Sequence, residues 1–203
     1  GACDWSSDVC SSDLTVAYAH GKDVPVLLDA KRGDIGNTAR QYAEILDVVD
    51  AITVNPYLGG DSLQPFLDRA DKGIFVLCRT SNSGGADLQD LELGSGETVY
   101  ERVAGLAEAW NTNDNVGLVV GATAPAELEE IRELVPDLPF LVPGVGAQGG
   151  DEEAAVEYGL ADGVGLVNSS RGIIFAGEDA AGDYFEAAGA AAKRLKDGLN
   201  RHR

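Results

Sequence analysis

The strongest constraint on the fold is a series of six short apolar segments that are continuous rather than alternating. A continuous apolar run of this length is typical of a strand that is buried on both faces of a parallel sheet. The segments are VPVLLDA (24–30), AITVNPY (51–57), GIFVLCRT (73–80), NVGLVVGAT (115–123), PFLVPGVG (139–146) and GVGLVNSS (163–170).

Stretches with helical character follow these segments. In TAPAELEEIRELV, an apolar stripe runs through Leu128 and Ile131, acids occur early, and Thr123 is a candidate N-cap. Six strand–helix units in a row predict an α/β fold. The expected helices span roughly 36–48, 60–70, 97–112, 125–135, 151–160 and 183–200.

The positions of polar residues favour a TIM (β/α)8 barrel over a doubly wound sheet. Nearly every apolar segment ends in a short polar or glycine-rich stretch, and barrel active sites are built from the loops that follow the strands. These stretches read DAKRGD, NPYLGG, RTSNSGG, GATAP, PGVGAQGG and NSSRG. A full barrel needs eight units and about 250 residues, so we expect the first two βα units to be missing.

The first 14 residues, GACDWSSDVCSSDL, fit no helical or strand period. Residues 4–14 resemble the conceptual translation of a DNA-sequencing adapter, and we interpret residues 1–14 as a non-native segment. Residues 15–203 are then a partial (β/α)8 barrel catalytic domain. A longer gene with a different sequence upstream of Thr15 is the expected finding.

The net charge of −19, from 15 basic and 34 acidic residues, argues against nucleic acid and anionic membranes as partners. It leaves room for a small anionic ligand, because a local pocket can be positive. An acidic surface with few lysines indicates adaptation to high salt. The three cysteines form no even framework and no CxxC motif, so we expect reduced thiols and a cytoplasmic protein.

Charged residues of alternating sign follow the first apolar segment, in LLDAKRGDIGNTA (27–39). The period of two in a strand places Asp29 and Lys31 on one face, in the barrel mouth, and Asp34 follows in the loop. Beside fixed negative charge, Lys31 is a candidate proton donor. An ion-paired strand end without a catalytic role is the alternative.

Two glycine-rich loops predict a phosphate site. PGVGAQGG and NSSRG follow the segments that would be strands seven and eight of a barrel, where backbone N–H groups bind phosphate in barrels of the phosphate-binding type. Gln148 and Arg171 are placed to assist, Arg171 through a forked, charge-assisted contact. Each loop alone is weak support, because glycines often only make turns.

Five motifs together resemble orotidine 5'-phosphate decarboxylase, in its second, longer subfamily. They occur at five strand ends in the family's order, and the similarity runs from about Thr15 to the last helix. The one small departure is Ser83, where the family usually has proline. The motifs are DAKRGDIGNTA, ITVNPYLGGDSLQPFL, RTSNSGG, PFLVPGVGAQGG and NSSR.

The resemblance implies decarboxylation of orotidine 5'-monophosphate to uridine 5'-monophosphate in de novo pyrimidine biosynthesis, by a carboxy-lyase with no metal and no cofactor. Asp29 would lie against the departing carboxylate, and Lys31 would stabilise and then protonate the C6 carbanion. Asp34 and Thr38 would reach across a homodimer interface into the partner's site.

The same resemblance implies the substrate-binding residues. Ser81 would contact the pyrimidine, Gln148 would bridge base and phosphate, and Arg171 would bind the phosphate. Pro143 and Ser170 lie in the two phosphate-loop motifs and are carried over with them.

One part of the family's charge array has no counterpart in this sequence. The family supplies another lysine and a ribose-binding acid from its first two strands, and Lys22 lies in a turn at the wrong end of the barrel. We therefore expect the polypeptide as written to be inactive or unstable, and its parent gene to encode an active enzyme.

Two alternatives remain open at this point. One is a magnesium-dependent sugar-phosphate decarboxylase on a related barrel, and the other is an inactive, truncated phosphate-binding fragment. Cys78 is interpreted as a small core residue rather than a nucleophile. His20 and His202 are interpreted as isolated, exposed side chains.

Overall fold

A computed structural model describes residues 14–145, 150–160, 165–178 and 183–203. The chain divides into two compact units. The first comprises the residues up to Val76 together with 110–116, and the second comprises 77–109 and 117–203. The boundary passes through two strands of one sheet, β3 (Gly73–Arg79) and β4 (Val116–Val120).

The order of the strands separates the two architectures that the sequence left open. Among the described residues the sheet has six strands in the order β1-β2-β3-β4-β5-β6, and the neighbours whose register is resolved pair in parallel. A doubly wound sheet reverses its order at a switch point, whereas each barrel strand lies beside its successor. The order is therefore that of a barrel. The remaining strands are β1 (Leu27–Arg32), β2 (Ala51–Val54), β5 (Phe140–Pro143) and β6 (Gly165–Asn168).

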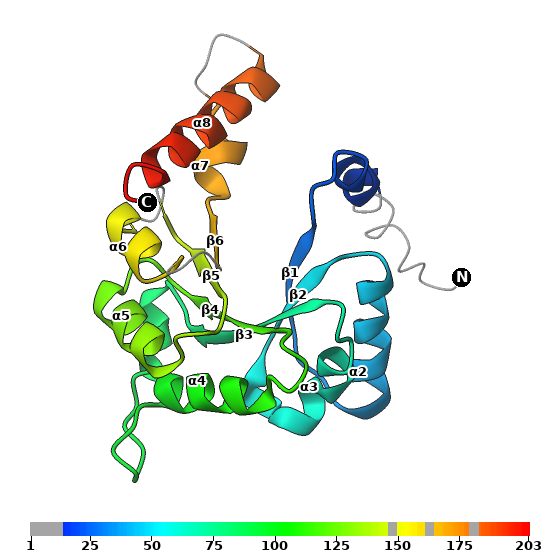
Figure 1. Cartoon of the computed structure of the whole chain (residues 1–203), viewed down its shortest axis with the longest axis vertical. Helices are drawn as coiled ribbons and strands as arrows, with labels where there is room; N and C mark the ends of the chain where they lie inside the picture. The colour runs from blue at the N-terminus through cyan, green and yellow to red at the C-terminus, as the bar shows by residue number, and fades with distance from the viewer. Residues whose placement is uncertain (1–13, 146–149, 161–164, 179–182) are drawn as a thin grey trace. The chain divides into compact units, whose positions relative to one another are not determined.

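In the first unit, helices α2 (Gly36–Ala43) and α3 (Gly60–Leu67) lie side by side and follow β1 and β2 (Figure 1). Two short 3-10 helices, η1 (Glu44–Asp47) and η2 (Pro56–Leu58), complete the connections. All four residues of β2 are buried, as the apolar sequence predicted. The largest buried side chains of this unit are Leu46, Ile52, Leu63, Phe66 and Ile74.

In the second unit, helices alternate with the later strands (Figure 1). The core of this unit is formed by apolar side chains of β4, α5 and β5, such as Leu118, Leu128 and Phe140. The elements are η3 (Ser83–Asp87), α4 (Val99–Trp110, whose last residue belongs to the first unit), α5 (Pro125–Leu134), α6 (Glu152–Glu157), α7 (Arg171–Ile174) and α8 (Tyr184–Leu199).

Three expectations about these elements were wrong in part. No residue of β1 or β6 is fully buried, because each strand has a sheet neighbour on one side only among the described residues. The helix expected over 36–48 ends as α-helix at Ala43 and continues as η1. Thr123 does not cap α5, since its hydroxyl instead donates to the Ser81 carbonyl at 2.9 Å.

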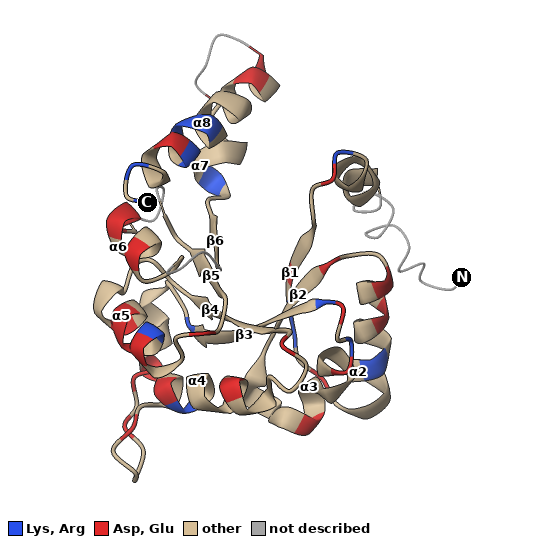
Figure 2. Ribbon diagram, in the orientation of Figure 1, with Lys and Arg blue, Asp and Glu red and all other residues tan. Residues whose placement is uncertain are grey.

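Acidic residues are distributed over the helices of both units (Figure 2). The helix α5 alone carries Glu127, Glu129, Glu130 and Glu133. Among the described residues, no helix is long and apolar enough to cross a membrane.

Candidate active site

The charged segment of the first unit lies on a bulge in β1. Leu28 pairs with Ile52 and Arg32 pairs with Val54, so four steps along β1 are matched by two steps along β2. The residues between Leu28 and Arg32 therefore bow out of the regular ladder, opposite Thr53. The simple period of two that the sequence analysis applied to Asp29 and Lys31 does not hold here.

The bulge nevertheless brings the two predicted residues into contact. Lys31 Nζ lies 2.5 Å from Asp29 Oδ1. The Thr53 hydroxyl donates to the same Asp29 oxygen at 2.8 Å, and the Lys31 backbone N–H donates to Thr53 Oγ1 at 2.9 Å. Thr53 is fully buried, whereas the Asp29 and Lys31 side chains are 52% and 47% exposed. The pair is thus open to a ligand and anchored from below by a buried hydroxyl.

Lys31 has a left-handed backbone, with φ of 48°. For a residue other than glycine this conformation costs about 1–2 kcal/mol relative to the right-handed region. Hydrogen bonds on both sides offset that cost. The Lys31 N–H is bound by Thr53, and the carbonyl of Arg32 accepts the Asn55 N–H at 2.7 Å.

Asp34 and Thr38 follow the bulge at the start of α2. Asp34 is half-buried, and its Oδ1 accepts the Ile35 N–H at 2.8 Å. Thr38 lies in the first turn of α2 and is exposed. Both residues belong to the first unit, like the Asp29–Lys31 pair.

In the second unit, the backbone at Ser81 is held tightly after β3. A Cβ on Gly121 would lie 2.8 Å from Ser81 N, Cα and Cβ, so only glycine permits this approach. Thr123 donates to the Ser81 carbonyl on the other side. The half-buried Ser81 is therefore fixed by the end of β4 and the residues that follow it.

The rest of the RTSNSGG loop is fixed by polar side chains that sequence reasoning did not single out. Gln89 Oε1 accepts the Thr80 N–H at 2.9 Å, and Gln89 Nε2 donates to the Thr80 hydroxyl at 3.0 Å. The buried Arg79 forms an ion pair with Asp90, with Nε 2.9 Å from Oδ1. The sequence signal was a charged residue, Arg79, at the end of an otherwise apolar strand.

The predicted phosphate residues lie at the ends of β5 and β6. Pro143 is half-buried, and its carbonyl accepts the Ala122 N–H at 2.9 Å. The carbonyl of Ser170 accepts the Ile174 N–H at 2.8 Å, and the exposed Arg171 begins α7. Gln148 lies outside the described residues.

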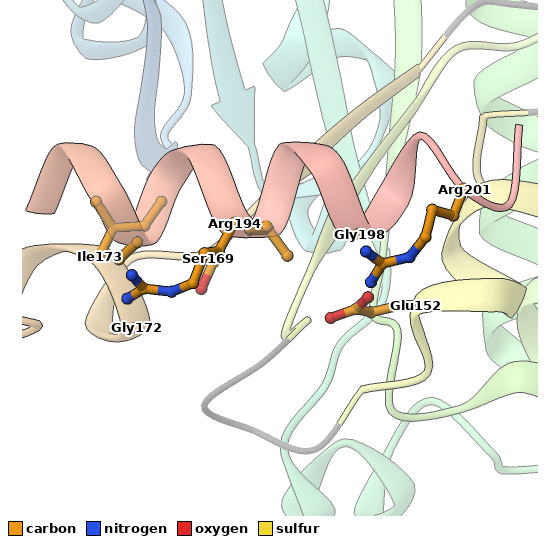
Figure 3. Close-up of a pocket in the computed structure, with 9 residues that line it drawn as sticks. Glu152, Ser169, Gly172, Ile173, Arg194, Gly198 and Arg201 are labelled. Atoms are coloured by element: carbon orange, nitrogen blue, oxygen red, sulfur yellow. The ribbon is translucent and has the colours of Figure 1, made fainter.

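A pocket of about 220 Å³ lies next to this loop, between the start of α7 and helix α8 (Figure 3). Ser169 and Gly172, which flank the predicted pair Ser170 and Arg171, line the pocket together with Arg194 of α8. Arg194 gave no signal in the sequence, because a basic residue on a helix is usually a solvated one.

Cys78 and His20, which were expected to have no catalytic role, lie in different environments. Cys78 is buried, and burial raises the pKa of its thiol to about 12, which fits a core residue rather than a nucleophile. His20 is not isolated, because its Nε2 lies 2.8 Å from Asp50 Oδ2. Among the described residues, no group of three or more His, Cys, Asp or Glu side chains is arranged to hold a metal ion.

Comparison with known proteins identifies the family. The profile of the orotidine 5'-phosphate decarboxylase / HUMPS family matches residues 11–183. The chain belongs to this family. The orotidine 5'-phosphate decarboxylase of Haloarcula marismortui is 76% identical over 201 residues, covering 93% of this chain and 73% of the relative. That of Halorubrum lacusprofundi is 74% identical over 200 residues, covering 93% of this chain and 72% of the relative.

Solved structures with a similar fold point to the same family. The Leishmania donovani OMP decarboxylase superposes with a TM-score of 0.73 at 46% identity, covering 87% of this chain and 69% of that one. The UMP synthase of the same organism gives a TM-score of 0.77 at 47% identity, covering 88% of this chain and 39% of that one. The fold is the α/β barrel fold of this family. The decarboxylase relatives at 74–76% identity support the activity of a carboxy-lyase converting orotidine 5'-monophosphate to uridine 5'-monophosphate.

These comparisons give no support to the magnesium-dependent alternative. The family match begins at residue 11 and so does not test the boundary between residues 14 and 15. The division into residues 1–14 and 15–203 stays a prediction.

Proposed function

We propose that Lys31 is the proton donor of orotidine 5'-monophosphate decarboxylation in this chain, and that Asp29 lies against the departing carboxylate. The observation that carries this proposal is the contact between Lys31 Nζ and Asp29 Oδ1, on a bulge at the carboxyl end of β1. Barrel enzymes place their reacting groups at this end of the strands.

The proposed reaction balances as follows. The bond between C6 of the pyrimidine and its carboxylate breaks, carbon dioxide leaves, and the electron pair stays on C6. The Lys31 ammonium stabilises that developing charge and then transfers a proton to C6, which gives uridine 5'-monophosphate and a neutral amine that solvent reprotonates. A charge array fixed before the substrate arrives stabilises the transition state without reorganising.

We assign substrate binding to residues of the second unit. Ser81 contacts the pyrimidine, and Arg171, Ser170 and Pro143 bind the phosphate together with Gln148. Support comes from the tight placement of Ser81 against Gly121 and from the exposed Arg171 at the start of α7. Phosphate binding remote from the reacting carbon supplies binding energy that can be used in the transition state.

We also propose a homodimer in which Asp34 and Thr38 act in the partner's site. Support comes from their placement directly after the catalytic bulge, in a connection that leaves Thr38 exposed on α2. The cytoplasmic location remains part of the same proposal, on the ground that Cys78 is a free thiol.

The test is an assay of orotidine 5'-monophosphate decarboxylation by the protein expressed from its gene, monitored as the loss of absorbance of the orotate ring. We expect turnover at the same rate in EDTA and in millimolar magnesium. Turnover that requires magnesium, or turnover only of a sugar phosphate, would support the rival reaction and refute this one.

A further inference from the structure

Thr53 is one of the few buried polar residues among those described, with no exposed surface. It lies within the strand AITV, whose other members are apolar. A buried hydroxyl needs hydrogen-bond partners to offset its desolvation, and the identity of those partners shows what holds it there.

Both partners of the Thr53 hydroxyl belong to the catalytic bulge, which is the stretch of β1 between Leu28 and Arg32. Its proton is donated to Asp29 Oδ1 and its lone pair accepts the Lys31 N–H. A hydroxyl has one proton, so the donation to Asp29 fixes its rotation and directs a lone pair toward Lys31. One side chain therefore orients the carboxylate of Asp29 and the backbone of Lys31 at the same time.

The bulge has no other ladder pairing at this point, since the resolved register passes from Leu28–Ile52 to Arg32–Val54. Lys31 is also held in a left-handed conformation that a lysine does not adopt by preference. The Thr53 hydroxyl binds the N–H of Lys31 in this conformation.

We infer that Thr53 is a positioning residue for decarboxylation, which sets the geometry of the Asp29–Lys31 pair without touching the substrate carbon. The inference rests on the proposed function of Lys31. It assigns the γ-hydroxyl, rather than the bulk of the side chain, as the group that matters.

The test compares Thr53→Val, which keeps the shape and removes the hydroxyl, with Thr53→Ser, which keeps the hydroxyl. We expect kcat for orotidine 5'-monophosphate to fall by about 10²-fold in Thr53→Val, with a smaller change in KM, because misplacement of a reacting group has an effect of this size. Thr53→Ser should recover most of the wild-type kcat. Ile52→Val is the matched control in the same strand and should keep the wild-type kcat.

Two kinetic results would overturn the inference. One is a Thr53→Val protein that folds and keeps the wild-type kcat. The other is a Thr53→Ser protein that loses as much activity as Thr53→Val, since that would assign the effect to packing.

A measurement without substrate separates this inference from the proposed function. Amide hydrogen exchange reports the Lys31 N–H directly, and we expect it to be protected in the wild type and about 5- to 10-fold faster in Thr53→Val. If the wild type does not decarboxylate orotidine 5'-monophosphate, the proposed function fails. Hydrogen exchange alone then shows whether the Lys31 N–H is bound by Thr53. An unprotected Lys31 amide in the wild type overturns the inference even if Thr53→Val does not fold.

Discussion

Lys31 Nζ lies 2.5 Å from Asp29 Oδ1 at a bulge where β1 carries two more residues than β2 between their flanking pairs. In a regular strand, residues two apart point to the same face but are separated by two rises of the backbone. The bulge interrupts this regular geometry, and within it Lys31 has a left-handed backbone with φ of 48°. The contact is therefore made in an irregular stretch of β1, which Thr53 of β2 also contacts.

The proposed dimer predicts complementation between two inactive variants. Lys31→Ala and Asp34→Ala should each lose decarboxylation, but a mixed dimer has one site with both residues intact if Asp34 acts across the interface. After unfolding and refolding of an equal mixture, we expect roughly a quarter of the wild-type activity, from random assortment in a two-fold dimer. A mixture as inactive as its parts would place Asp34 in its own subunit's site.

Gly121→Ala tests the support of Ser81. The added Cβ would lie 2.8 Å from three atoms of Ser81, which must then move. Overpacking of this kind costs about 1–3 kcal/mol, and we expect a lower melting temperature and a higher KM for orotidine 5'-monophosphate. The control is Gly105→Ala in α4, where a Cβ meets nothing within 4 Å and should stabilise by about 0.5–1 kcal/mol. An unchanged KM in Gly121→Ala would separate Ser81 from binding.

Asp50 predicts a stability difference that depends on pH. Its Oδ2 accepts the Val26 N–H at 2.7 Å and contacts His20, and these hydrogen bonds hold the pKa of the carboxyl below its usual 3.8. Because the pKa of the Asp50 carboxyl is lower in the folded state, its ionised form stabilises the fold above pH 3.8. This stabilisation is lost as the pH falls from 3.8 through the pKa of the folded state. Asp50→Asn should therefore unfold more easily than the wild type at pH 6, with the gap closing below pH 3.8.

Chemical denaturation at a series of pH values checks this expectation. The control is Asp71→Asn, since the Asp71 side chain is 74% exposed and its ion pair with Lys72 is long, at 3.9 Å. A gap for Asp50→Asn that persists at low pH would mean that the carboxylate's charge plays no part.

The net charge of −19 predicts that salt stabilises the fold. Like charges repel over about 10 Å in 0.1 M salt but over only about 3 Å in 1 M salt. The melting temperature should therefore rise from dilute buffer to molar KCl. A higher melting temperature in dilute buffer would contradict the interpretation as a high-salt protein.

A charge reversal on α5 sharpens this salt test. Glu129 and Glu133 are four residues apart on exposed positions of the helix, so they repel each other. Glu133→Lys replaces the repulsion with attraction near the helix C-terminus and should stabilise by about 0.5 kcal/mol in dilute buffer. The gain should shrink in molar KCl, and a gain that is independent of salt would point to another cause.

Much of the fold could be predicted because it depends on local patterns. Continuous apolar runs located the strands, and the helix expected over 125–135 is observed as α5 from Pro125 to Leu134. The four-residue helix α7 is too short to show a hydrophobic period, so no sequence pattern predicted it. Thr123 was misassigned because the Ser81 carbonyl, 42 positions away in sequence, competes for its hydroxyl.

The contact between Asp29 and Lys31 was predictable from the sequence, but the bulge on which it lies was not. The alternating charges after the first apolar segment singled out Asp29 and Lys31, and the period of two gave the correct neighbours for a reason that the bulge overturns. Thr53 was missed because a threonine in a buried strand is an ordinary β-former. The available signal was the single hydroxyl of Thr53 in an apolar segment, the next such segment along the chain after the charged stretch 27–39.

The most direct test of the account is the decarboxylation rate of Lys31→Ala, measured together with the affinity for uridine 5'-monophosphate. Lys22→Ala is the control, because Lys22 is an exposed lysine in the turn before β1. We expect Lys31→Ala to lose at least about 10³-fold in kcat while it still binds the nucleotide, and Lys22→Ala to match the wild type. A Lys31→Ala enzyme that keeps kcat within about tenfold of the wild type would contradict the assignment of Lys31 as the proton donor.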